Sequence, residues 1–301
     1  MRKICFKLRF TTALHFGNGS LESTDIAFKA DTLFSALYIE AMKAGCEKDL
    51  FRYIDEGRLL FSNAFPYCED ELFLPKPVLK LEGIDTSDPA DRKKFKNLSY
   101  IPVSMWDSYL KGEMDIDSVR KDFGVFISSE HAAVRREEET LPYHVGKFKF
   151  YDGCGLYFIL MYESDEAYDL VSRLMELLSY SGIGGKRSSG LGRFEVLHAK
   201  ENKQLSGLLD REGRRYMLLS CALPLDSEAG DVIDGASYVI EKRSGFVASD
   251  TYENEWRKKK DLYVFGEGSC FPAKFKGDIY DVSGGGRHPV YRYARGMFLG
   301  I

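Results

Sequence analysis

The chain has 301 residues, of which 44% are hydrophobic and 29% are charged, a balance typical of a folded globular protein. Its 42 basic and 46 acidic side chains give a formal net charge of −4. Proteins that bind nucleic acid alone and without sequence preference are usually basic, so the composition argues against that class. Any nucleic-acid site must therefore be a local basic patch on an acidic body.

The sequence shows no sign of a membrane segment or a metal site. It has no run of 18 apolar residues, so we expect neither a transmembrane helix nor a membrane partner. Its opening stretch alternates charged and apolar residues and lacks the apolar centre of a secretory signal. The six cysteines are scattered without a CxxC pair, which argues against structural zinc. We therefore expect reduced thiols, no cofactor and a cytoplasmic location.

Hydrophobic periodicity predicts that the chain opens with a strand and continues with a helix. Residues 2–10 alternate apolar and charged side chains, the pattern of a half-buried strand. Apolar residues spaced by three and four positions then predict a helix over about 33–42. Asp31 is the expected N-cap of this helix, and Gly45 is expected to end it.

A second helix and further strands complete the first part of the chain. Ser164 precedes a segment with a single apolar stripe, which predicts a helix that ends at Gly182. Strands are expected at residues 58–61, 72–77, 155–162 and 193–197. The resulting order is β-α-β-β-α-β, which is the split βαβ or ferredoxin-like arrangement.

Two regions depart from this pattern. Residues 82–150 contain three prolines, two charge runs and no long period, so we expect an irregular insertion that projects from a compact body. Residues 201–301 show little helical period, and we expect a second, β-rich domain with strands at 216–223, 237–240, 261–265, 278–282 and 291–299. The fold class is therefore α+β, with one domain over 1–200 and another over 201–301.

The most unusual segment is the glycine loop, residues 182–192, in which basic residues and serines alternate with five glycines. Glycine lets backbone N–H groups approach an anion closely, and the loop is longer than the usual 2–6 residues. It is not a P-loop, because Tyr180 stands where that pattern needs its first glycine. A solvated connection is the alternative. The candidate RNA contacts are Gly184, Gly185, Lys186, Arg187, Ser188, Ser189 and Arg193.

The C-terminal segment 284–295 repeats this chemistry. Arginine forks bind phosphates in a bidentate manner, and tyrosine rings offer stacking surfaces for unpaired bases. An edge strand with outward-facing arginines explains the segment equally well. The candidate RNA contacts here are Arg287, Tyr291, Arg292 and Tyr293.

Residues suited to catalysis are few. His15 lies in a turn-rich loop and could act as a general base in RNA cleavage, although a hydrogen-bonding histidine is the more ordinary reading. Asp31 could be a catalytic carboxylate, but helix capping already explains it. No metal-binding spacing involves the remaining histidines, His131, His144, His198 and His288. We therefore predict that the chain is not an enzyme.

Together these segments resemble the RAMP superfamily of CRISPR proteins, and most of all the fourth Csm subunit of type III-A effector complexes. The resemblance covers most of the chain and rests on five segments in order: Leu14-His15-Phe16-Gly17, residues 31–37, Phe65-Pro66-Tyr67 with Leu74-Pro75-Lys76-Pro77, the glycine loop, and residues 287–292.

The resemblance implies two ferredoxin-like (RRM-like) modules in a non-catalytic subunit that grips the repeat-derived 5′ handle of the guide RNA. His15, Phe16 and Gly17 become candidate RNA contacts. The implied partners are the large polymerase-like subunit and the first backbone RAMP subunit of the Csm complex, with target RNA nearby. An inserted thumb in this superfamily intrudes into the guide–target duplex. We assign that role to part of residues 82–150, with His131 and Arg135 as candidate contacts.

Two alternatives from other classes stay open. Some RAMP relatives cut the CRISPR repeat with a glycine-loop protein that carries a histidine base, so the chain could be a repeat endoribonuclease. It could also be a scaffold subunit whose basic loops bind protein carboxylates. Incubation with repeat RNA in the absence of metal distinguishes the first alternative, and copurification of bound RNA distinguishes the second.

Overall fold

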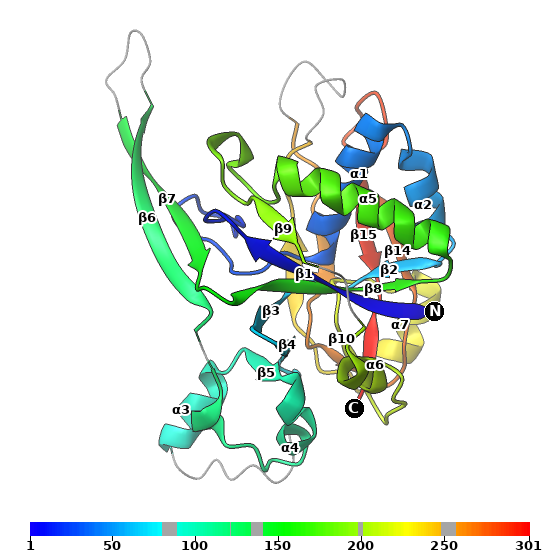
Figure 1. Cartoon of the computed structure of the whole chain (residues 1–301). Coiled ribbons are helices and arrows are strands. Elements are labelled where there is room, and N and C mark those ends of the chain that lie inside the picture. Colours follow the sequence, from blue (N-terminus) through cyan, green and yellow to red (C-terminus); the bar gives the residue numbers. More distant parts are fainter. Residues whose placement is uncertain (80–88, 121, 134–140, 198–200, 248–256) are drawn as a thin grey trace.

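The protein is described by a computed structural model (Figure 1), which places residues 1–79, 89–120, 122–133, 141–197, 201–247 and 257–301. Its main feature is a seven-stranded sheet in the order β5-β4-β3-β8-β1-β9, with β2 pairing to the far end of β8. The strands are β1 (Arg2–Phe10), β2 (Leu59–Phe61), β3 (Phe65–Cys68), β4 (Glu71–Pro75), β5 (Tyr100–Pro102), β8 (Cys154–Tyr162) and β9 (Phe194–Val196).

Three helices cover one face of this sheet: α1 (Ala30–Ala44), α2 (Glu47–Asp55) and α5 (Asp165–Ser181) (Figure 1). Local signals set two of their ends as predicted. The Ser164 hydroxyl accepts a hydrogen bond from the Ala167 N–H at the start of α5, and Gly45 ends α1 in the left-handed conformation. The β-α-β-β-α-β order and the α+β class are confirmed.

The expected N-cap of α1 is wrong. The N-cap position is Lys29, and Asp31 lies inside the first turn, buried. The side chain that satisfies this end of the helix comes from elsewhere in the chain, because the Ala30 N–H donates to Asn63 Oδ1 at 2.7 Å. A carboxylate in the first turn still suits the helix dipole, but Asp31 is oriented toward other partners described below.

The expected irregular insertion is only partly correct. Its first part holds α3 (Pro89–Asn97), the 3₁₀ turns at Val103–Met105 and Ile116–Ser118, and α4 (Trp106–Leu110). Its second part is regular, because β6 (Gly124–Ala133) and β7 (Leu141–Phe150) pair along their full length. We call this β6–β7 hairpin the thumb ribbon, and Figure 1 shows it extending away from the body. The alternation of apolar and polar residues is weak in its sequence, because most described side chains of the ribbon are at least partly exposed.

The C-terminal part is β-rich, as expected, and made of small antiparallel units: a β13-β10-β16 sheet and the β11–β12 and β14–β15 hairpins. Two short helices, α6 and α7, were not expected. The bounds are α6 (Lys203–Leu209), β10 (Tyr216–Leu218), α7 (Asp226–Ile233), β11 (Ile240–Arg243), β12 (Leu262–Phe265), β13 (Cys270–Phe271), β14 (Gly277–Asp281), β15 (Tyr291–Arg295) and β16 (Phe298–Gly300).

The two parts of the chain share their cores. Tyr293 of β15 lies among the rings of Phe34 and Phe61, and contacts between α1 and β15 are extensive. On the other face of the main sheet, Trp106 and Tyr109 of α4 pack in one cluster with Met217 of β10. Within the described ranges, no helix has the length and apolar character needed to cross a membrane. The domain boundary near residue 200 stays a prediction.

Candidate nucleic-acid interface

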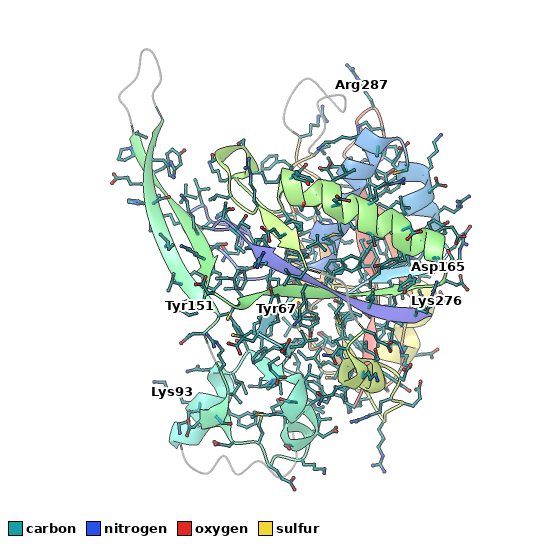
Figure 2. All side chains as sticks on the ribbon, viewed as in Figure 1. Tyr67, Lys93, Tyr151, Asp165, Lys276 and Arg287 are labelled. Atoms are coloured by element: carbon teal, nitrogen blue, oxygen red, sulfur yellow. The ribbon has the colours of Figure 1, made fainter. Side chains whose placement is uncertain are left out.

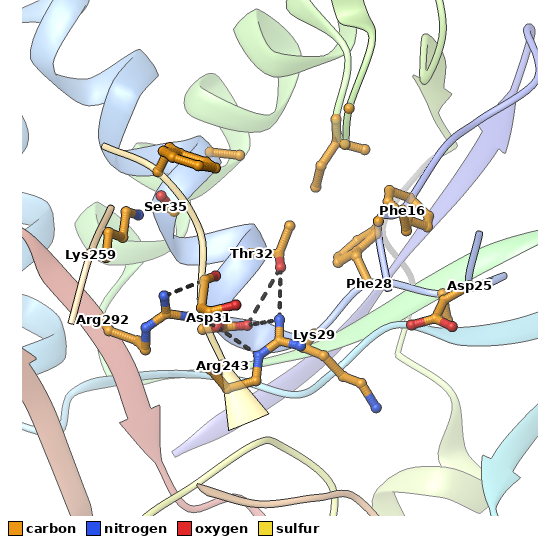
Figure 3. Close-up of a pocket in the computed structure, with 18 of the residues that line it drawn as sticks. Phe16, Asp25, Phe28, Lys29, Asp31, Thr32, Ser35, Arg243, Lys259 and Arg292 are labelled. Carbon is orange, nitrogen blue, oxygen red and sulfur yellow. Dashed lines mark hydrogen bonds and ion pairs between the residues drawn. The ribbon is translucent and has the colours of Figure 1, made fainter. Parts of the chain in front are cut away.

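A pocket of about 290 Å³ lies where four segments meet (Figure 3). They are the loop after β1, the first turns of α1, the glycine loop, and the C-terminal part around the end of β11. Its lining includes Phe16, Gly17, Asp25, Lys29, Asp31, Thr32, Ser35, Gly184, Gly185, Arg187, Arg243, Lys259 and Arg292. The structure thus brings together several predicted contacts that are more than 100 residues apart in the sequence.

The glycine loop docks tightly against the loop after β1. The Gly185 N–H donates to the His15 carbonyl at 2.8 Å, and the Gly192 N–H donates to the Ala13 carbonyl at 2.9 Å. A Cβ atom on Gly184, whose φ is +98°, would stand 2.7 Å from the His15 carbonyl oxygen. Here the glycines allow the loop to approach another part of the same chain closely. The sequence predicts instead that they allow the close approach of an anionic ligand.

His15 is buried and holds this loop to the thumb ribbon. Its Nδ1 lies 2.7 Å from the Gly146 carbonyl oxygen, so Nδ1 carries the proton and donates. Phe16 is also buried, with its ring edge-on to Phe28. Gly17 is exposed at the mouth of the pocket. Within this predicted motif, only Gly17 therefore offers an exposed surface.

The thumb ribbon and the glycine loop meet through three side chains. The His131 ring stacks on Tyr143 with 5.6 Å between centroids, and the Lys186 Nζ lies 5.3 Å from the centroid of Tyr143. His131 Nε2 is also 2.9 Å from the Ser129 hydroxyl. The structure thus joins His131 and Lys186 through Tyr143, a residue that the sequence did not single out. Arg135 lies outside the described residues.

Asp31 is the electrostatic centre of the pocket floor. Its carboxylate accepts hydrogen bonds from Arg243 at 2.7 and 3.0 Å and from Arg292 at 2.6 Å. Burial alone would raise the pKa of the Asp31 carboxyl, but the two guanidinium groups lower it to about 2. Asp31 is therefore ionised and fully paired, which leaves it no role as a general base.

A second ion-pair cluster lies beside the first. The Lys29 ammonium is bonded to Glu241 at 3.0 Å and to Glu267, and Glu267 also accepts from the Asn63 amide. The Lys29 charge is thus neutralised within the protein.

Two cations of the pocket have no such partner. Arg187 and Lys259 line it, and neither makes an ion pair with the residues that the structure describes. Burial lowers the pKa of the Lys259 ammonium to about 8, and the neighbouring Arg292 charge adds to this. The Arg292 Nε is also buried without a hydrogen-bond partner in the described ranges. The pocket therefore has donors and positive charge to spare, which suits an anion. Nothing in the local sequence marked Lys259.

The other predicted contacts are dispersed. Arg287 is exposed and points away from the body in Figure 2. Tyr291 is half-buried with its ring 4.6 Å from Phe51, and Tyr293 is fully buried with its hydroxyl 3.0 Å from the Phe61 nitrogen. In this structure Tyr293 has no ring face open to a base. Ser188, Ser189 and Arg193 are exposed.

The described ranges contain no group of three or more histidine, cysteine or acidic side chains arranged to hold a metal ion. The cysteines in them are free thiols.

Comparisons with known proteins agree on one family. Residues 211–301 match the family model described as the CRISPR Csm4 C-terminal domain. The "CRISPR system Cms protein Csm4" of Mycobacterium tuberculosis is 35% identical over 291 residues, covering 95% of this chain and 94% of the relative. The protein of the same name from Streptococcus thermophilus is 34% identical over 300 residues, with the same coverage.

Solved structures share the fold. This chain is similar over 100% of its length to a chain of the Csm3-Csm4 subcomplex in the type III-A CRISPR-Cas interference complex, with a TM-score of 0.69 and 18% identity, covering 99% of that chain. It is similar to a chain of the Csm1-Csm4 cassette in complex with cA4, with a TM-score of 0.66 and 19% identity, covering 100% of this chain and 98% of the other. From the identity and coverage of its curated relatives, the chain belongs to the Csm4 family of CRISPR system proteins.

Proposed function

We propose that the chain is a non-catalytic subunit of a type III-A Csm interference complex and that it binds the 5′ handle of the guide RNA. Family membership supports the place in a Csm complex, and the structures of Csm3-Csm4 and Csm1-Csm4 assemblies support a backbone subunit and the large subunit as partners. The handle is unpaired RNA, whose phosphates and bases are accessible to a protein groove.

The observation that carries the RNA-binding part is the pocket with its unpaired cations. Arg187 comes from the glycine loop and Lys259 from the C-terminal part, and the paired Asp31 fixes Arg243 and Arg292 below them. A chain with a net charge of −4 that concentrates unpaired positive charge in one pocket is suited to a single anionic ligand. We place a stretch of handle phosphates across this pocket and the glycine loop.

The thumb ribbon supplies the second half of the proposal. It extends away from the body (Figure 1). The Lys186 side chain of the glycine loop contacts Tyr143 on the ribbon. A ribbon at this place suits the predicted role of intruding between guide and target, with His131, the cross-strand partner of Tyr143, as a contact. The proposal assigns the target RNA to the outer part of the ribbon.

The endoribonuclease alternative has less support. The His15 ring is buried, and its Nδ1 is committed to the Gly146 carbonyl. No acid partner for RNA cleavage contacts it in the described part of the chain. His15→Asn, which keeps an amide N–H donor for the Gly146 carbonyl but removes the imidazole base, should leave both guide maturation and target cutting in the assembled complex at wild-type rates. Loss of either activity with assembly unchanged would overturn the non-catalytic assignment.

The test of RNA binding is a salt series. The affinity of the assembled complex for guide RNA is measured with Arg187→Ala, Lys259→Ala and the control Lys111→Ala, an exposed cation of the insertion outside the pocket. Each lost phosphate contact should reduce the slope of log affinity against log salt by about 0.7. The two pocket variants should show this reduction for every handle sequence, because phosphate contacts position RNA without reading it. Slopes equal to that of the control would refute the site.

A further inference from the structure

Two cysteines face each other where the thumb ribbon joins the body. Cys68 ends β3 and Cys154 begins β8, and the two residues are direct partners in the antiparallel pairing of these strands. Their sulfur atoms are 2.7 Å apart, and both are free thiols. Figure 2 labels Tyr67 and Tyr151, which precede them in the chain and mark this junction.

The backbone around the pair has the geometry that a disulfide needs. The Glu69 N–H donates to the Gly153 carbonyl at 2.7 Å, so residues 69 and 153 form a hydrogen-bonded pair. Because such pairs alternate along an antiparallel ladder, Cys68 and Cys154 occupy a non-hydrogen-bonded position, where Cα atoms are about 4.5 Å apart. This separation falls inside the range of about 4.4–6.8 Å that disulfides span without moving the backbone.

The two thiols differ in access. Cys68 is half-buried, whereas Cys154 is buried behind it. An oxidant from solvent therefore meets Cys68 first, and Cys154 is placed to attack the product from within. Among the cysteines that the structure describes, no other pair has its sulfur atoms in contact, so the arrangement is specific to Cys68 and Cys154.

We propose that Cys68 and Cys154 form a redox-active pair that closes to a cross-strand disulfide in exchange with a low-molecular-weight disulfide such as oxidised glutathione. In the first step Cys68 loses its proton, attacks that disulfide as the thiolate, forms a mixed disulfide and releases one small thiolate, which takes up a proton. In the second step Cys154 likewise loses its proton, attacks the Cys68 sulfur and releases the second small thiolate, which is also protonated. The protein loses two electrons and two protons, and the small disulfide is reduced to two thiols.

The bond would act at the root of the thumb ribbon. The turn of residues 151–153 connects β7 to β8, and the Cys154 N–H already bonds to the Tyr151 carbonyl at 3.0 Å. Oxidation would join this turn covalently to the β3–β4 hairpin, whose turn residue Glu69 lies against Gly153. The ribbon would then be attached to the body by a covalent bond as well as by its strand pairing. The inference stands on geometry alone and does not depend on the proposed RNA binding.

The test uses the full chain, equilibrated in glutathione buffers of rising oxidised fraction, then quenched, alkylated and mapped by mass spectrometry. We expect a linked peptide pair containing Cys68 and Cys154. In the Cys154→Ala variant, Cys68 should instead carry glutathione. At the same concentrations of oxidised glutathione, the Cys68–Cys154 disulfide should be the main form of the wild-type chain. Cys68→Ala should leave Cys154 unmodified. Both alanine variants are checked for native circular dichroism.

Three results would overturn the proposal, and all three can be read from the wild-type chain. These are free thiols at both positions in every buffer, or glutathione retained on Cys68 without closure. A bond from Cys68 to any other cysteine would overturn it equally.

Discussion

The Lys186 Nζ lies 5.3 Å from the centroid of the Tyr143 ring, and this contact links the glycine loop to the thumb ribbon. Lys186 adopts a left-handed backbone conformation, with φ of +57°, which is unusual for a residue other than glycine. The contact therefore belongs to a loop whose shape is closely constrained. Tyr143 in turn stacks on His131, its partner on the opposite strand, so the contact with the loop involves both strands of the ribbon.

The first prediction follows from this contact. Tyr143→Leu and Lys186→Met should each speed hydrogen exchange at the backbone amides of residues 143–148. The double variant should add little to either, because a cation–π contact contributes about 0.5–1 kcal/mol only when both partners are present. Tyr180→Leu, which changes a tyrosine that is 75% exposed on α5, is the matched control and should leave the ribbon unchanged. Strictly additive effects would mean that the two residues act independently.

The second prediction concerns Asp31. Asp31→Asn leaves Arg243 and Arg292 as buried cations without their carboxylate, so the free energy of unfolding should fall by about 3–5 kcal/mol. Asp165→Asn removes an exposed carboxylate paired with Arg2 and should cost no more than about 1 kcal/mol. Urea titration of both variants measures the difference. Equal and small losses would contradict the central role of Asp31.

Asp31 also predicts an acid limit. Its pKa is lowered to about 2 in the folded chain, so its contribution to stability is fully present above the ordinary carboxyl pKa of about 4. That contribution is lost as the pH falls from about 4 through 2. The difference between wild type and Asp31→Asn should therefore narrow over this interval. A difference that stays constant down to pH 2 would argue against the ion pairs.

The third prediction concerns Lys259. Its lowered pKa means that its charged form destabilises the folded chain, whereas the charged form of Asp31 stabilises it. Below about pH 8 the folded chain carries a buried charge, and this cost is relieved as the pH rises through 8 toward the ordinary lysine value of about 10.4. Without RNA, Lys259→Met should therefore be more stable than wild type at pH 7, and the gap should shrink by pH 9. With bound guide the order at pH 7 should reverse if the ammonium contacts phosphate. Thermal unfolding with and without RNA tests both statements.

The fourth prediction separates two glycines of the same loop. Gly184→Ala would place a methyl group 2.7 Å from the His15 carbonyl oxygen, whereas Gly190→Ala meets nothing within 4 Å. Both have positive φ, so both changes carry the strain of about 1–2 kcal/mol of a left-handed residue. Only Gly184→Ala should also displace the loop and weaken guide binding. Equal guide affinities for the two variants would show that the docking of the loop on His15 is not needed.

Local signals allowed much of the fold to be predicted, and long-range contacts account for what could not be. Ser164 and Gly45 act on their own helix ends, and the sequence marks both correctly. Asp31 has the position expected of a cap in the sequence, but its true partners, Arg243 and Arg292, are more than 200 residues away. Lys259 and Tyr143 also reach the candidate site through contacts with residues distant in the sequence, so no neighbouring residue identifies them.

The two ion-pair clusters at the start of α1 match a cation and an anion on one segment with an anion and a cation on β11. Lys29 pairs with Glu241 and Asp31 with Arg243, so positions two residues apart on one segment match positions two residues apart on β11 with the signs inverted. A shift of β11 by two residues would bring like charges together. A chimera that exchanges residues 201–301 between relatives must therefore transfer Glu241 and Arg243 together and keep Lys29 and Asp31 opposite them. The start of α1 thus restricts which C-terminal domains the chain can be combined with.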